Sequence, residues 1–94
     1  MFAIATTDYF LRRARKFLRK HPDLRERFAQ VVDDLKEDPF APHLAYHHLG
    51  GKLKDVQAVS ITYDYRIILT IEVMDKEIIL LDIGGYDEVY RCAK

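Results

Sequence analysis

The sequence lacks the marks of secreted and membrane proteins. Its only cysteine, Cys92, excludes an intramolecular disulfide and favours a reducing compartment, so we expect the protein in the cytoplasm. Apolar runs such as Ile67 to Leu69 and Ile78 to Leu81 are far too short to span a bilayer. The opening residues, MFAIATTDYF, have no basic region followed by an apolar one, as a secretory signal would. We therefore expect no membrane partner.

Common catalytic motifs are also missing. There is no P-loop, no dinucleotide-binding fingerprint, no Gly-x-Ser-x-Gly and no paired-cysteine zinc site. His43, His47 and His48 lie close together, but no distant cluster of carboxylates matches them, so surface histidines are a better interpretation than metal ligands. We therefore expect neither a metal nor another cofactor.

Net charge is absent only as a sum over the whole chain. Residues 1–20 hold six bases and one acid, a net charge of +5, whereas residues 21–38 hold three bases and six acids, a net charge of −3. Nucleic acid responds to a local basic surface, so a neutral total is only weak evidence against it. The basic first segment has two open interpretations: a solvated helix face, or a contact with RNA or phosphate.

The first part of the chain is expected to form a strand and two helices. Phe2–Thr6 is short and β-prone. Apolar residues recur at helical spacing in Tyr9–Lys20, after an N-cap at Thr7 or Asp8. The second helix lies within HPDLRERFAQVVDDLKEDP, with proline in its first turn and a second proline ending it. The two helices are expected to pack as an antiparallel hairpin.

The second part of the chain is expected to form a sheet. After a loop from Phe40 to Lys54, strands are predicted at Val56–Thr62, Tyr65–Val73 and Glu77–Ile83, joined by connections short enough for hairpins. The order β-α-α-β-β-β predicts an α+β fold. In it, the N-terminal helical hairpin packs on one face of a small antiparallel sheet. We expect one domain over residues 1–94.

Side-chain alternation divides the predicted sheet into two faces. In the middle strand one face holds Ile67, Leu69, Ile71 and Val73, and the other holds Arg66, Ile68, Thr70 and Glu72. In the last strand the same rule groups Ile79, Leu81 and Ile83 against Ile78, Leu80 and Asp82. Two helices cover only one face, so the other is expected to be partly open, to carry Arg66 and to meet a partner or substrate.

Reactive side chains are densest in residues 47–67 and in GGYDEVY, residues 84–90. RNA cleavage without a metal needs a base for the 2′-hydroxyl proton, cations for the charged phosphorane and an acid for the 5′-oxygen. Imidazoles, lysines, Arg66 and tyrosines supply such groups. From the residues alone a structural interpretation is preferred, in which Tyr65 and Tyr90 fill the core, Arg66 pairs with Asp64 and the lysines are solvated.

Three of these stretches, HHLGGKLKD, YDYRIILTI and IILLDIGGYDEVY, resemble the RelE/ParE toxin superfamily. Its members often read His-x-Leu-x-Gly-x-Leu-Lys-Gly, then Asp-Tyr-Arg-Ile, then Ile-Gly-x-His-Asp-Glu-Val-Tyr. The similarity covers nearly the whole chain and implies the fold predicted above. It also implies the toxin of a type II toxin–antitoxin module. One branch of these toxins cleaves mRNA on the ribosome without a metal, and another poisons DNA gyrase.

The His-x-Leu-x-Gly pattern resembles the cleaving, RelE/YafQ-like branch most, and this resemblance implies the site. It implies catalytic roles for His47, Asp64, Arg66 and Tyr86. It implies RNA-binding roles for Lys52, Lys54 and Tyr90. Arg66 is then expected on the scissile phosphate and Tyr90 against a base, while His47 or Tyr86 moves protons.

Two positions depart from the pattern. Tyr86 stands where histidine is usual, and Ser60 stands where one group of these toxins has a further histidine. A phenol, with a reference pKa of about 10 against about 6.5 for imidazole, is a poorer proton shuttle at neutral pH. It still donates a hydrogen bond to phosphate or stacks on a base.

The resemblance leaves three functions to compare. The first is a ribosome-dependent mRNA endoribonuclease, the second a non-enzymatic gyrase poison, and the third a degenerate toxin that keeps antitoxin binding with little activity. In each case the expected partner is a cognate antitoxin, and DNA is contacted only through it. The first function adds mRNA on the ribosome as substrate.

Overall fold

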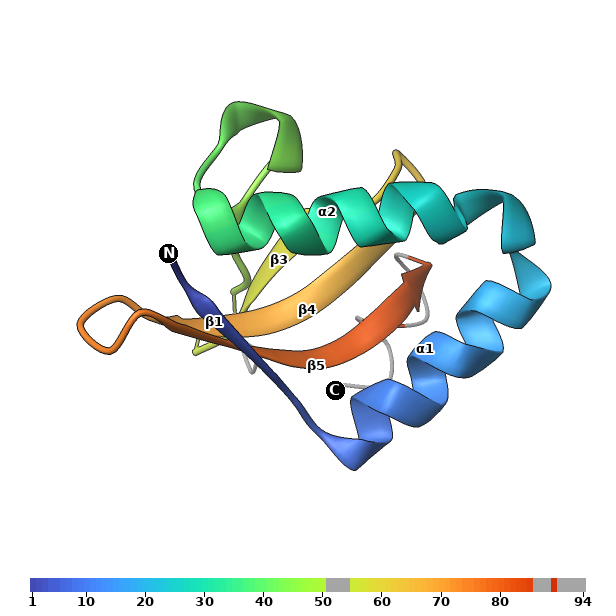
Figure 1. The fold of residues 1–94 in the computed structure, drawn as a ribbon, viewed down its shortest axis with the longest axis horizontal. Coiled ribbons are helices and arrows are strands. Elements are labelled where there is room, and N and C mark those ends of the chain that lie inside the picture. Colours follow the sequence, from blue (N-terminus) through green and yellow to red (C-terminus); the bar gives the residue numbers. More distant parts are fainter. Residues whose placement is uncertain (51–54, 86–88, 90–94) are drawn as a thin grey trace.

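The computed structural model describes residues 1–50, 55–85 and 89. The chain runs through β1 (Ala3–Thr6), α1 (Asp8–Lys20), a 3-10 turn η1 (Pro22–Leu24), α2 (Arg25–Glu37), a second 3-10 turn η2 (Pro42–Leu44), β2 (His47–His48), β3 (Gln57–Ser60), β4 (Tyr65–Glu72) and β5 (Glu77–Gly85) (Figure 1). The predicted α+β fold is confirmed. The two-residue strand β2 is an addition, formed where a loop was predicted. No helix within the described ranges is long and apolar enough to cross a membrane.

The sheet has the strand order β1-β5-β4-β3-β2. The predicted meander is present, since β3 pairs antiparallel with β4, and β4 with β5. The N-terminal strand β1, however, pairs parallel with β5, from Ala3 opposite Glu77 to Thr6 opposite Leu80. The sheet is therefore mixed. A parallel pair needs a long crossover connection, and such a distant pairing leaves no turn signal in the sequence.

Helix α1 begins where local chemistry favours it. The Thr7 side chain accepts a hydrogen bond from the Phe10 N–H at 3.0 Å, which satisfies one of the free donors of the first turn. Of the two predicted N-caps, Thr7 is thus the one used. Asp8 in the first turn and basic residues in the last turn complement the helix dipole.

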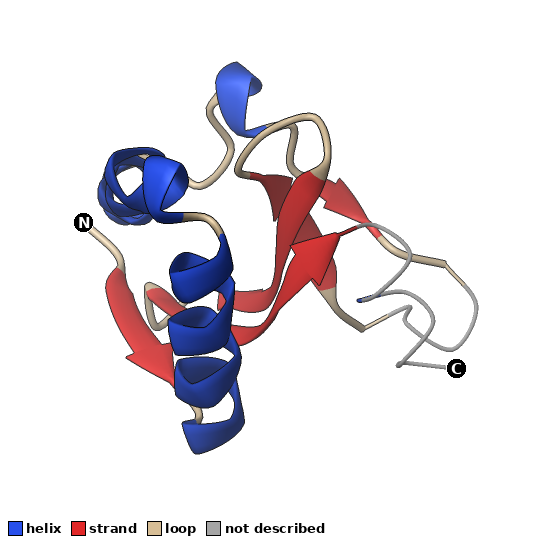
Figure 2. Cartoon of the chain, turned by 90° about the vertical axis from the view of Figure 1, so that its right-hand side faces the viewer, coloured by secondary structure: helices blue, strands red, loops and turns tan. Residues whose placement is uncertain are grey.

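Both helices contribute to one core, on one side of the sheet. The main core consists of Phe10, Ala14, Phe17, Val31, Leu35, Leu44, Val59, Ile61, Ile67, Leu69, Ile78, Leu80 and Ile83. Turn η1 joins the helices, and the hairpin is open: α2 lies over β3 and β4, whereas α1 lies beside the end of β5 (Figures 1 and 2). A smaller buried cluster of Leu49, Ala58, Ile68 and Val89 lies on the opposite face.

The predicted alternation holds in β4 and is wrong in the first part of β5. Ile67 and Leu69 face the main core, as expected. In β5, Ile78 and Leu80 face that core together with Ile83. The reason is a register shift: Ile68 lies opposite Asp82, but Leu69 lies opposite Leu80. One extra residue in β5, at position 81, forms a β-bulge. Because side chains alternate along a strand, the extra residue moves the side chains before it to the opposite face of the sheet.

Candidate functional site

Three of the seven predicted site residues lie within the described residues: His47, Asp64 and Arg66. The other four, Tyr86, Lys52, Lys54 and Tyr90, lie outside them. Their roles stay predictions from the resemblance.

Arg66 is held on the face of the sheet that the helices leave open. It lies on β4 between two neighbours, Ser60 on β3 and Gly84 on β5. Its Nη1 donates a hydrogen bond to Ser60 Oγ at 2.7 Å. Directly opposed residues on paired strands have their side chains on the same face, so this contact follows from the register. Ser60 therefore orients the Arg66 side chain. In the sequence it was noted only as a serine at a position where some of these toxins have histidine.

Asp64 lies in the turn between β3 and β4, two residues before Arg66. Its side chain is exposed, and its N–H donates to Thr62 Oγ1 at 3.3 Å. Within the part of the chain that the structure describes, Asp64 and Arg66 form no ion pair. The structural interpretation that paired them is wrong, because the turn keeps the carboxylate in solvent while Ser60 holds the guanidinium.

His47 lies on β2, opposite Ala58 of β3. Its Nδ1 is 2.9 Å from the Ala45 carbonyl oxygen. A carbonyl only accepts, so Nδ1 carries the hydrogen in this contact, and the hydrogen bond orients the imidazole ring. Ala45 adopts a left-handed conformation, φ 52° and ψ 42°, which turns the chain from η2 into β2.

The sheet brings His47 and Arg66 onto one surface. Their partners on β3, Ala58 and Ser60, are two residues apart and therefore share a face. Two strand spacings of about 4.8 Å and two residues of about 3.4 Å place the Cα atoms of His47 and Arg66 roughly 12 Å apart. Two long side chains approaching from that distance can meet one phosphodiester between them. The apolar Ile68, 6% exposed, lies between them on the same face.

The neighbouring histidines have structural contacts. His43 Nε2 donates to Asp34 Oδ2 at 2.8 Å, which ties η2 to α2. This hydrogen bond, with a second from Gln30, lowers the pKa of Asp34. His48 lies 3.4 Å from the hydroxyl of Tyr46, whose pKa is raised by burial. In the described ranges, no three His, Cys, Asp or Glu side chains form a group that could hold a metal ion.

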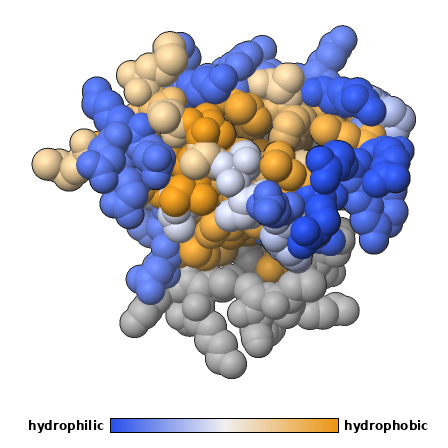
Figure 3. All heavy atoms as spheres, turned by 60° about the horizontal axis from the view of Figure 1, so that its bottom comes forward, coloured by the Kyte–Doolittle hydropathy of each residue, from blue (hydrophilic) through white to orange (hydrophobic). Residues whose placement is uncertain are grey.

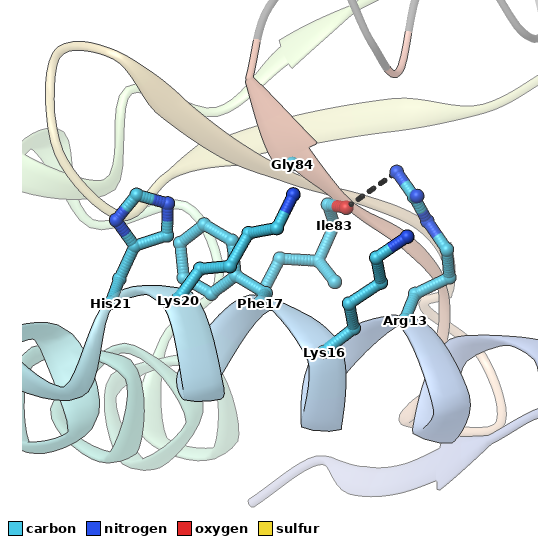
Figure 4. A pocket seen from close by; sticks show the side chains of 7 residues that line it. All are labelled: Arg13, Lys16, Phe17, Lys20, His21, Ile83 and Gly84. Carbon is cyan, nitrogen blue, oxygen red and sulfur yellow. Dashed lines mark hydrogen bonds between the residues drawn. The ribbon is translucent and has the colours of Figure 1, made fainter.

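A basic hollow lies between α1 and the end of β5, on the side of the sheet opposite Arg66 (Figure 4). It opens to solvent and is lined by Arg13, Lys16, Phe17, Lys20, His21, Ile83 and Gly84. Arg13 is fixed there, since its Nε donates to Asp82 Oδ1 at 2.9 Å and its Nη2 to the Ile83 carbonyl at 3.1 Å. The sequence predicted a basic helix but not this hollow, which depends on how α1 packs against β5.

No protein-family model matches the chain, and no curated protein matches it. Solved structures do. A metal-bound toxin from Helicobacter pylori is 27% identical over 95% of this chain and 99% of that chain, with a TM-score of 0.77. YafQ from Escherichia coli strain BL21(DE3) is 15% identical over 96% and 99%, with a TM-score of 0.79.

A third similar structure is archaeal. A chain of the RelE–RelB complex from Pyrococcus horikoshii OT3 is 22% identical over 89% of this chain and 93% of that chain, with a TM-score of 0.68. The structural similarity to these toxins extends over nearly the whole length of the chain, including its five-stranded sheet. The predicted resemblance is thereby confirmed: the chain shares the fold of these RelE- and YafQ-like toxins.

Proposed function

We propose that the protein is the toxin of a type II toxin–antitoxin module and cleaves mRNA on the ribosome without a metal. One observation carries the proposal: Arg66 and His47 share the face of the sheet opposite the helices, each held by a hydrogen bond. An oriented guanidinium and an oriented imidazole on one surface are suited to phosphodiester cleavage. A binding protein that blocks gyrase needs neither group.

In the proposed reaction the RNA supplies its own nucleophile. His47 Nε2 takes the proton of the 2′-hydroxyl, and the 2′-oxygen attacks the adjacent phosphorus. Arg66 stabilises the charge that collects on the phosphorane oxygens. The bond from phosphorus to the 5′-oxygen then breaks, and that oxygen receives a proton, which leaves a 2′,3′-cyclic phosphate and a 5′-hydroxyl. By resemblance, Tyr86 is the donor of this proton and Asp64 the acidic residue of the site.

The resemblance also supplies the rest of the substrate surface. Lys52 and Lys54 contact the RNA backbone, and Tyr90 stacks on a base. The substrate is mRNA in the ribosome, so the protein acts in the cytoplasm.

The proposed partner is a cognate antitoxin, through which alone the toxin reaches DNA. The archaeal RelE is found in complex with RelB, and this chain shares its fold. Apolar side chains are exposed where such a partner would bind: Tyr9 and Leu11 on α1 are 47% and 40% exposed, and Phe40 is 47% exposed. An amphipathic segment of the antitoxin would cover them.

The test is induced expression with growth and mRNA ends followed together. The wild type should arrest growth and produce new mRNA ends at codon boundaries. Arg66→Ala should lower cutting by roughly 10²- to 10³-fold, the usual loss when one such group is removed. Arg25→Ala, which removes an exposed arginine of α2 on the helix-covered side of the sheet (Figure 1), is the matched control and should cut like the wild type.

Three outcomes would contradict the proposal. Unchanged cutting by Arg66→Ala would remove the assigned role of that residue. Gyrase-dependent DNA breakage without mRNA cuts would identify a ParE-like poison. Tight antitoxin binding without growth arrest would identify a degenerate toxin. Tyr86→Phe, measured in the same experiment, asks whether the phenol hydroxyl takes part.

A further inference from the structure

We propose that the basic hollow between α1 and β5 binds a second phosphate of the RNA strand whose scissile phosphate lies on Arg66. The inference rests on the proposed function, because it assigns a further part of the same substrate to the chain. It differs from a general basic surface, since it names one hollow and two lysines. Neither Lys16 nor Lys20 has a role in the catalytic step.

The hollow exists because β1 covers β5 only as far as Leu80. Beyond that residue no strand of the described ranges pairs with this edge of β5, and α1 lies along it instead. Arg13 of α1 occupies the nearer part of this edge, bound to Asp82 and to the Ile83 carbonyl. Lys16 and Lys20 follow at one-turn spacing, and in Figure 4 Lys16 extends towards Arg13 while Lys20 extends towards Gly84.

Arg13 is paired with Asp82, but the two lysines of the hollow have no counterion among the described residues. Among the residues that the structure describes, neither Lys16 nor Lys20 forms an ion pair, and the described lining contains no acidic side chain. Like charges four residues apart on a helix destabilise it by about 0.2–0.5 kcal/mol. Lys16 and Lys20 carry that cost while both side chains extend from α1 towards the end of β5, an arrangement suited to an anion (Figure 4).

The floor and rim of the hollow are rigid. Phe17 and Ile83, which form its apolar floor, are 7% and 1% exposed. The His21 ring packs against Phe17 and Tyr65, with centroid distances of 4.8 and 4.6 Å. A fixed imidazole at the rim adds a hydrogen-bond donor or a stacking surface next to the two lysines. Lys16 and Lys20 are themselves exposed, so the packed floor and rim distinguish this hollow from a solvated row of bases.

The hollow and the Arg66 site meet at one pair of residues. Gly84 lines the hollow and lies directly opposite Arg66 in the sheet, which places their Cα atoms about 5 Å apart. Arg66 faces one side of the sheet, and the hollow lies on the other, at the edge. A single RNA strand crossing the end of β5 therefore meets both. Figure 3, which brings the bottom of Figure 1 forward, shows hydrophilic side chains gathered on the right-hand side, where α1 lies.

The test measures binding separately from cleavage. The purified protein is titrated into a short, labelled single-stranded 2′-O-methyl RNA, which lacks the attacking hydroxyl and stays intact. Lys16→Gln with Lys20→Gln should weaken binding about tenfold and lower the slope of log K against log salt by about 0.7 per lost phosphate contact. Lys16→Arg with Lys20→Arg should restore both values, since arginine keeps the charge.

The matched control removes the same charge from the same helix. Arg12 and Arg15 are exposed on α1 but do not line the hollow, so Arg12→Gln with Arg15→Gln should weaken binding less than threefold. Equal losses in the two double variants would overturn the inference in favour of diffuse attraction. Binding of an acidic peptide as tight as that of the RNA, and equally dependent on Lys16 and Lys20, would overturn it in favour of a protein partner.

The two proposals fail in different ways. If Arg66→Ala cuts mRNA normally while the lysine variant loses RNA binding, the proposed chemistry falls and the second phosphate site stands. If Arg66→Ala abolishes cutting while the lysine variant binds and cuts like the wild type, the chemistry stands and the second site falls.

Discussion

The contact between Arg66 and Ser60 is the residue-level feature on which the proposed chemistry depends most. An arginine side chain has many rotamers, and the 2.7 Å hydrogen bond to Ser60 Oγ selects among them. Ser60→Ala should lower mRNA cleavage about tenfold, because a lost hydrogen bond to a charged group is worth about 1.5–3 kcal/mol and part of it returns through water. The measurement is the yield of new mRNA ends at matched protein levels.

Ser60→Thr is the control for this prediction, since it keeps the hydroxyl on a strand where threonine is favoured. It should cut within about threefold of the wild type, because the acceptor for Arg66 is retained. Urea unfolding of both variants separates a loss of orientation from a loss of fold. Equal cutting by Ser60→Ala and the wild type would mean that Arg66 needs no partner on β3.

The sequence predicted Arg66 as a site residue but not its partner. A two-residue turn at Tyr63-Asp64 would have paired Ser60 with Ile67. The observed connection contains residues 62–64, with the Ile61 N–H donating to the Tyr65 carbonyl, so Ser60 lies opposite Arg66 instead. A difference of one residue in a turn exchanges the faces of a strand, and polar turn residues alone do not determine it.

Among the secondary-structure elements, α1 depends on a single capping residue. Thr7→Ala should lower the free energy of unfolding by about 1 kcal/mol, because the Phe10 N–H loses its acceptor at the start of the helix. Thr7→Ser keeps the oxygen and should lose much less. Urea unfolding followed by circular dichroism measures both. A loss as large in Thr7→Ser as in Thr7→Ala would show that the methyl group, not the cap, matters.

The segment around η2 is tied to α2 by a pH-dependent contact. Hydrogen bonds from His43 and Gln30 lower the pKa of Asp34 below its ordinary value of 3.8. The folded state therefore favours the carboxylate, and the resulting stability is complete above the unfolded pKa of about 3.9 and lost as pH falls through the lower folded value. Compared with the wild type, Asp34→Asn should unfold at lower urea concentration near pH 6.

That difference should shrink as the pH falls below about 4, because the wild-type carboxylate then gains a proton as well. Asp33→Asn, an exposed neighbour on α2 without a described hydrogen bond, is the control and should change the midpoint little at either pH. A constant difference between Asp34→Asn and the wild type from pH 6 to pH 3 would contradict the assignment.

Helices were easier to predict than strands, for a physical reason. The predicted helix Tyr9–Lys20 differs from α1 by one residue, since apolar spacing and a cap are local signals. The bulge at residue 81 is not local. It appears only when β5 pairs with β4, and it let the alternation place Ile78 and Leu80 on the wrong face. The pairing of β5 with β4, and not the sequence of β5 alone, determines which of its side chains face the core.

At the scale of the whole molecule, the two faces of the sheet have different tasks. The helix-covered face holds the main core, while the opposite face holds the small cluster around Ile68 and the side chains of Arg66 and His47. The net charge of zero conceals a similar division, since the bases of α1 are concentrated beside β5. Stability is therefore expected to reside mainly on the helix-covered face, and the proposed chemistry on the opposite face.

Two adjacent isoleucines of β4 test this division, because they have the same chemistry and opposite faces. Ile67 is fully buried in the main core, and Ile68 is 6% exposed in the small cluster. Ile67→Ala should lower the free energy of unfolding by about 3–5 kcal/mol, since helices and sheet together prevent the cavity from closing. Ile68→Ala should cost about 1–2 kcal/mol, because a thin layer relaxes into the gap. Urea unfolding gives both values, and equal losses would mean that the open face is packed as firmly as the core.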